Sequence, residues 1–97
     1  MRLEITAEGN RFRFDGALNR DTLMLYSPFK LLNTVTQRVQ FDFSALTVVD
    51  TAGLAWLLQQ LAQAQATGLK IELCNVPQQL LSLADVSAVR ALLPIVE

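Results

Sequence analysis

The residues with the clearest chemical potential are a carboxylate and a hydroxyl next to each other, Asp50 and Thr51. Asp50 ends an apolar run, and the strongest helical pattern of the chain begins at Thr51. A carboxylate there can accept hydrogen bonds from the N–H groups of the first helical turn, and it lies at the positive end of the helix dipole. We therefore expect Asp50 to be the helix cap.

Two interpretations of this turn remain open from the residues alone. In the first, it is only a well-capped helix start, in which Gly53 lets another backbone approach closely. In the second, the Thr51 hydroxyl is exposed at a helix N-terminus, which tolerates a phosphate because free N–H groups and the dipole meet its charge. The Asp50 carboxylate would oppose that charge, so phosphorylation at Thr51 would change a docking surface without unfolding the domain.

The helix that begins at Thr51 and extends to about residue 66 has an unusual outward face. At 3.6 residues per turn one stripe is apolar and is expected in the core: Leu54, Leu57, Leu58 and Leu61. The opposite face carries no charge and consists of Ala52, Trp56, Gln59, Gln60 and Gln63. A neighbouring helix of the chain could cover Trp56, but uncharged polar surroundings favour an exposed aromatic anchor for a partner. Thr51 and these five residues are thus the predicted partner-binding site, which the uncharged Gln78, Gln79 and Ser82 of a later helix would extend.

The remaining composition argues against catalysis and against nucleic-acid binding. The chain has no histidine, Cys74 has no partner to activate it, and the four glycines are too widely spaced for a phosphate loop. The acidic residues form no metal-binding cluster, so we expect no catalytic residue, no metal and no cofactor. Eight basic and nine acidic residues nearly cancel, and no basic face for a nucleic acid is visible.

The sequence also indicates a location. Residues 1–6 are already an alternating strand pattern rather than a signal peptide, and glutamines interrupt the long uncharged stretch after Thr51. A single cysteine cannot form an intrachain disulfide. We expect a cytoplasmic protein without a transmembrane helix.

Hydrophobic periodicity predicts one α/β domain over residues 1–97. Strands are expected at residues 2–7, 11–14, 38–43 with an extension to 49, and 69–73, and the first two form a hairpin. A turn at residues 22–26 and helices at residues 28–36, 51–66 and 77–84 complete the pattern, with a last turn at residues 88–93. This order favours a four-stranded mixed sheet flanked by about three helices.

The turn at Asp50 also carries a resemblance to a known family. The run Val49-Asp50-Thr51-Ala52-Gly53-Leu54-Ala55 is similar to the D-[ST]-x-G signature of STAS domains, the family named for sulfate transporters and anti-sigma-factor antagonists. The turn at residues 16–19, the strand at residues 41–44 and the order of elements also resemble this family. The resemblance covers essentially the whole chain and implies the STAS-like fold.

Within the family, residues 50–58, the threonine at position 51 and the single-domain length resemble accessory subunits of ABC transporters that maintain outer-membrane lipid asymmetry. This resemblance implies a non-catalytic subunit that binds the transporter's ATPase subunit, with Thr51 at or near the contact and the membrane reached only through the complex. The alternative is an anti-sigma-factor antagonist switched by phosphorylation at Thr51. Asn19 departs from many antagonists, which carry an acidic or hydroxyl residue there. Direct binding of a lipid or small ligand ranks low, because so short a chain leaves little room for a cavity beside a packed core.

Overall fold

The computed structural model describes residues 2–25 and 37–96. The helix expected at residues 28–36, and the end of the turn expected before it, lie outside this part of the chain.

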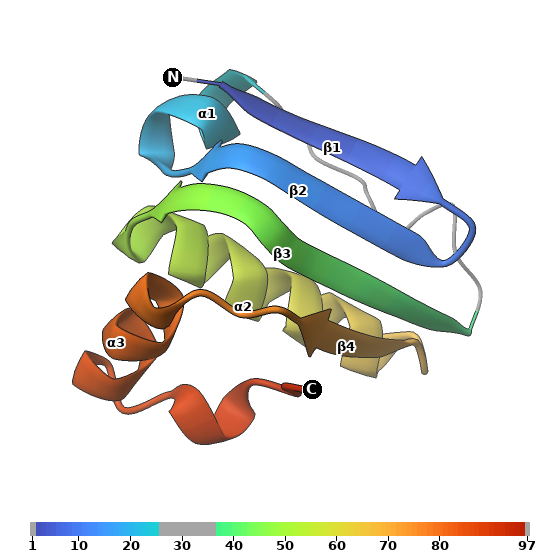
Figure 1. Ribbon diagram of the computed structural model, residues 1–97. Helices are drawn as coiled ribbons and strands as arrows, with labels where there is room; N and C mark the ends of the chain where they lie inside the picture. Colours follow the sequence, from blue (N-terminus) through green and yellow to red (C-terminus); the bar gives the residue numbers. More distant parts are fainter. Residues whose placement is uncertain (1, 26–36, 97) are drawn as a thin grey trace.

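Four strands form a single sheet in the order β1-β2-β3-β4 (Figure 1). These strands are β1 (Leu3–Glu8), β2 (Arg11–Leu18), β3 (Arg38–Val49) and β4 (Lys70–Cys74). β1 runs antiparallel to β2, whereas β2, β3 and β4 are mutually parallel. The predicted mixed sheet is thus confirmed. The hairpin between β1 and β2 turns at Gly9, whose φ of 60° is the left-handed conformation that glycine adopts easily.

Each parallel strand is followed by a helix. α1 (Arg20–Leu25) follows β2, α2 (Thr51–Ala66) connects β3 to β4, and α3 (Gln78–Val86) follows β4. After the short 3-10 turn η2 (Arg90–Leu92), the chain returns along β4, where the Leu73 N–H donates to the Pro94 carbonyl at 2.9 Å. Among the described residues, no helix is long and apolar enough to cross a membrane.

The core lies between one face of the sheet and α2. Alternate residues of β2 and β3 point phenyl rings at this face, because successive side chains of a strand lie on opposite sides. These rings belong to Phe12, Phe14, Phe41 and Phe43, and none of the four is more than 2% exposed. Leu57 of α2 and Leu80 of α3 are fully buried against the same cluster.

The other face of the sheet is charged. The side chains that alternate with the core residues include charged groups of both signs: Arg2, Glu4, Glu8, Arg11, Arg13, Asp15, Arg38, Asp42, Lys70 and Glu72. Several of them form ion pairs, such as Arg38 with Glu72 at 3.4 Å and Arg11 with Asp42 at 2.8 Å. Most of the charge of the described chain therefore lies on one side of the sheet, away from α2.

Candidate functional site

The predicted site lies where two parallel strands end side by side. Leu18 at the end of β2 pairs with Val49 at the end of β3, and a helix starts within two residues of each strand. The N-termini of α1 and α2 are therefore adjacent at the carboxyl edge of the sheet (Figure 1). Open α/β sheets form their binding surfaces at this edge.

Asp50 joins the two helix starts. Its backbone is extended, with φ −118° and ψ −174°, and its Oδ1 accepts a hydrogen bond from the Gly53 N–H at 2.9 Å. Its second oxygen, Oδ2, accepts a hydrogen bond from the Arg20 N–H at 3.2 Å. One carboxylate thus caps α2 and binds the first residue of α1.

Gly53 allows the first turn of α2 to lie close to the end of β2. A Cβ atom at this position would lie 2.2 Å from the Leu18 carbonyl oxygen, a distance that no side chain tolerates. The Asp50 N–H also donates to the Leu18 carbonyl, at 3.3 Å. The D-T-x-G run is therefore a packing requirement as well as a cap.

Asn19 caps α1. Its Oδ1 accepts a hydrogen bond from the Thr22 N–H at 3.0 Å, and its own N–H donates to Thr22 Oγ1 at 3.1 Å. Both side chains are buried, and Thr22 Oγ1 donates onward to the Ala17 carbonyl at 2.8 Å. From the sequence, Asn19 is expected only as the end of the turn at residues 16–19 and as a departure from many antagonists. Asparagine is a preferred residue directly before a helix, and its position before the helical stretch could have indicated this structural role.

Thr51 is exposed as the first residue of α2. None of the described residues makes a hydrogen bond to its hydroxyl. The hydroxyl therefore stands at the surface directly beside the Asp50 carboxylate.

The prediction that Trp56 is exposed is wrong. Only 8% of this residue is accessible, and its ring lies 5.8 Å from that of Phe14 and 6.3 Å from that of Phe41. The sheet itself covers it, because the buried face of α2 is rotated from the predicted leucine stripe. This face consists of Gly53, Leu54, Trp56, Leu57, Gln60 and Ala64, while Leu58 and Leu61 are only half-buried.

The other predicted partner-binding residues are divided by this rotation. Gln60 is buried at 3% exposure, Ala52 is half-buried, and Gln59 and Gln63 are exposed. On α3, Gln78, Gln79 and Ser82 are exposed. Gln79 Oε1 also accepts a hydrogen bond from the Val49 N–H at 3.0 Å, which connects α3 to the end of β3.

We use the term neutral helical surface for the exposed residues of α2 and α3. α2 contains no charged residue, and Asp85 is the one charged residue of α3. This surface and the charged sheet face lie on opposite sides of the same sheet. The arrangement can bind a partner, but the described residues contain no group of histidine, cysteine and acidic side chains that could hold a metal ion.

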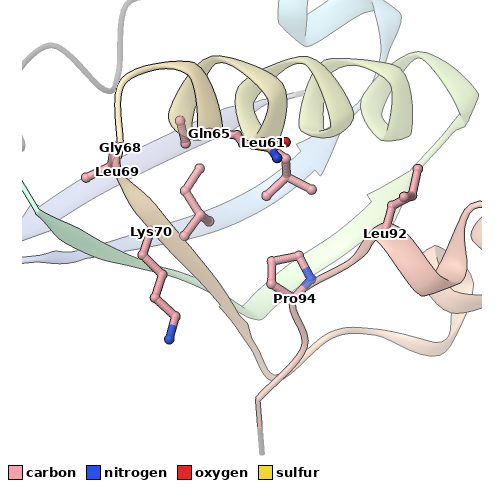
Figure 2. A pocket seen from close by; sticks show the side chains of 9 residues that line it. Leu61, Gln65, Gly68, Leu69, Lys70, Leu92 and Pro94 are labelled. Carbon is pink, nitrogen blue, oxygen red and sulfur yellow. The ribbon is translucent and has the colours of Figure 1, made fainter.

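A separate groove lies at the far end of α2 from Thr51. It has a volume of about 400 Å³ and lies between the end of α2, the start of β4 and the returning C-terminal segment (Figure 2). Its walls are mostly apolar, from residues that include Leu61, Leu69, Leu92 and Pro94. No pattern in the sequence indicates this groove, because its walls come from separate segments of the chain.

Comparison with known proteins gives a family and a fold. Residues 2–95 match the family model described as "Mlab, STAS domain". Among solved structures, the anti-sigma factor antagonist SpoIIAA in its unphosphorylated form is similar, with a TM-score of 0.66 and 13% sequence identity. The match covers 99% of this chain and 88% of the SpoIIAA chain. The comparison with curated proteins gives no match.

Proposed function

Because the chain belongs to the Mlab-type STAS domain family, we propose that it is a non-catalytic accessory subunit of an ABC phospholipid transporter. It binds an MlaF-like ATPase subunit and supports the assembly and activity of the transporter, and so contributes to lipid asymmetry of the outer membrane. The protein is cytoplasmic and reaches the inner membrane only through this partner.

The unequal distribution of charge is the observation that supports this proposal most directly. An exposed helix normally carries lysine and glutamate on its solvent side, yet α2 has none along sixteen residues. The cores of protein interfaces are depleted in charged residues, because burial of an unpaired charge is costly. The charged sheet face is therefore expected to remain in contact with solvent, and the neutral helical surface is expected to be buried by a partner.

Thr51, Ala52, Gln59 and Gln63 are the α2 residues proposed to contact the ATPase. The exposed Thr51 would lie at the edge of this contact. Trp56 and Gln60 are buried in the free protein. We therefore propose that these two residues do not contact the partner. They support the contact indirectly, because they pack α2 against the sheet.

Binding of this kind affects the ATPase through mass action. A subunit that binds the assembled ATPase pair more tightly than the separate subunits stabilises the pair by its difference in binding free energy. In this proposal the ATPase subunit hydrolyses the nucleotide, and this chain only binds the ATPase pair and stabilises it.

The test is a binding measurement between the purified chain and the ATPase subunit, by biolayer interferometry. Thr51→Glu places a carboxylate within the proposed contact, beside Asp50, and is expected to weaken binding at least tenfold. Thr67→Glu is the matched control, since Thr67 is also exposed but follows the last turn of α2. Equal affinities for wild type and Thr51→Glu would overturn the proposed contact, and absence of any binding would overturn the proposed partner.

A second candidate function is supported by the similarity in fold to the antagonist SpoIIAA. Here the chain would bind an anti-sigma factor, and phosphorylation of the exposed Thr51 would release it. Thr51→Ala would then remain bound constitutively in the presence of kinase and ATP, while Thr51→Glu would not bind. Affinity purification from the native cells separates the two functions, because it recovers either an ABC ATPase or a kinase of the anti-sigma type.

A further inference from the structure

β3 extends beyond the end of its neighbour β4. The two strands pair only as far as Asp42 opposite Cys74, whereas β3 continues to Val49. At Asn75 the chain adopts a left-handed φ of 54° and leaves β4 for the loop that leads to α3. The last part of β3 is therefore paired with β2 on one side and does not have β4 on the other.

Gln79 of α3 supplies a hydrogen-bond acceptor on that other side. Its Oε1 accepts a hydrogen bond from the Val49 N–H at 3.0 Å. The next N–H, that of Asp50, donates in the opposite direction, to the Leu18 carbonyl of β2 at 3.3 Å. This alternation is that of an extended strand between two neighbours. A side chain of α3 thus provides the bond that a neighbouring strand would otherwise provide.

The backbone of Gln79 is itself held in place. Its neighbour Leu80 and the next buried residue of α3, Ala84, are both 0% exposed in the core. The Leu80 N–H donates to the Pro77 carbonyl at 3.1 Å, which closes the first turn of α3. α3 also lies beside the start of α2 (Figure 1). The side chain of Gln79 therefore connects a helix that is fixed by core packing to the end of β3.

The bond at Val49 lies directly before the candidate site. Val49 is 2% exposed, and the next residue, Asp50, caps α2 through Gly53 and accepts from the Arg20 N–H of α1. Thr51 follows as the exposed first residue of α2. A displacement of the Val49 peptide therefore changes the orientation of the Asp50 carboxylate and of the Thr51 hydroxyl.

We propose that Gln79 is a positioning residue for the turn at Asp50 and Thr51. Its amide oxygen holds the end of β3 from the side of α3, while Leu18 holds it from the side of β2. The exposed starts of α2 and α3 thereby keep one fixed arrangement. The effect of Gln79 on the turn is independent of any partner. Its effect on ATPase binding rests on the proposed function, in which Thr51 lies at the contact.

Nuclear magnetic resonance of the free chain tests the positioning of the turn without a partner. Gln79→Met keeps the length of the side chain but removes the acceptor, so the Val49 amide should exchange with solvent at least tenfold faster. The amide resonances of Thr51 and Gly53 should shift in the same variant. The change at Val49 should exceed any change at the fully buried Leu57, whose amide reports the stability of the core.

Two further variants separate the hydrogen bond from other effects of the substitution. Gln78→Met is the matched control for the turn, because the exposed Gln78 donates to Ser82 within its own helix, at 3.3 Å. It should leave the Val49 amide unchanged. Gln79→Glu keeps an oxygen acceptor in the same place and should restore slow exchange of the Val49 amide. An equal exchange rate of Val49 in wild type and Gln79→Met overturns the proposal.

Biolayer interferometry with the ATPase subunit tests the consequence for binding. Gln79→Met should weaken binding about fivefold, the equivalent of one neutral hydrogen bond. Thr67→Met, an exposed change after the last turn of α2, should bind as wild type does. In a double-mutant cycle with Thr51→Ala, the effect of Gln79→Met should shrink, because Gln79 acts through the turn.

The outcomes distinguish this proposal from the proposed function. Additive effects of Gln79→Met and Thr51→Ala would mean that Gln79 touches the partner on its own, which overturns its role as a positioning residue. If the wild-type chain does not bind the ATPase, the proposed function fails. The exchange rate of the Val49 amide in the free chain then still decides whether Gln79 positions the turn.

Discussion

The side chain of Asp50 accepts a hydrogen bond from the backbone N–H of Arg20, at 3.2 Å and thirty positions away in the sequence. The same carboxylate caps α2 through Gly53. The start of α1 is therefore fixed relative to the start of α2 by a single side chain.

Asp50→Ala should lower the free energy of unfolding by about 1–2 kcal/mol, because α2 loses its cap and the Arg20 N–H loses its protein acceptor. Urea unfolding followed by circular dichroism measures this loss. Asp50→Asn is the matched variant, since its single amide oxygen can keep the bond to Gly53 but not both bonds. Its cost should be smaller, and an equal cost for both variants would mean that the negative charge matters more than the geometry.

Gly53→Ala should be among the most destabilising single-methyl changes in this chain. The added Cβ would lie 2.2 Å from the Leu18 carbonyl oxygen, so α2 must move away from the end of β2. We expect a loss of about 3 kcal/mol or more from this overpacking. Gly68→Ala is the control, because Gly68 has a positive φ of 75° but open space around it. That variant should lose only about 1 kcal/mol in the same urea titration.

Much of the fold could be predicted from local patterns. The alternation in β1 and β2 gave a hairpin, and the uninterrupted helical pattern after Asp50 gave α2 with its cap. β3 includes the extension predicted to residue 49, whereas β2 is longer than the strand predicted at residues 11–14, because it remains paired with β3 as far as Leu18 through two shifts in register. Such irregularities depend on the neighbouring strand and leave no periodic signal.

The orientation of α2 could not be predicted in the same way. A helical wheel ranks leucines as core residues and leaves glutamines outside, which rotated the expected face toward Leu58 and Leu61. In the structure the phenyl rings of β2 and β3 pack against α2, and the indole ring of Trp56 contacts two of them. The sheet decides which residues of the helix are buried, and that information lies in other strands.

Asp42 should make stability depend on pH in the acidic range. Burial alone raises the pKa of this carboxyl, but hydrogen bonds from Asn75 at 3.0 Å, the Ser44 N–H at 2.9 Å and Arg11 at 2.8 Å outweigh it and lower the pKa well below its ordinary value. A carboxyl whose pKa is lower in the folded state stabilises the fold above its unfolded pKa of about 4. This contribution is lost as the pH falls below about 4.

Asp42→Asn removes the charge and therefore tests this dependence. At pH 7 it should lower the free energy of unfolding by about 2 kcal/mol, since Arg11 keeps a weaker acceptor. Between about pH 4 and pH 2 the variant should lose less stability than wild type in parallel urea titrations. Asp15→Asn, at a half-exposed carboxyl with one 3.4 Å ion pair, should change stability by less than about 0.5 kcal/mol. Parallel pH profiles for wild type and Asp42→Asn would contradict the assignment.

Gln60 should be a position where the native residue lowers stability. Its side chain is 3% exposed, and no described donor makes a hydrogen bond to its Oε1 atom. A buried carbonyl oxygen without a donor costs about 1–3 kcal/mol, so Gln60→Met, which keeps the length of the side chain, should raise the free energy of unfolding by about 1 kcal/mol. The exposed neighbour Gln59→Met should change it by less than about 0.5 kcal/mol. A loss of stability in Gln60→Met would mean that Oε1 has a donor in solution. If Gln60→Met is more stable but binds the ATPase more weakly, the Gln60 amide supports ATPase binding even though it lowers the stability of the fold.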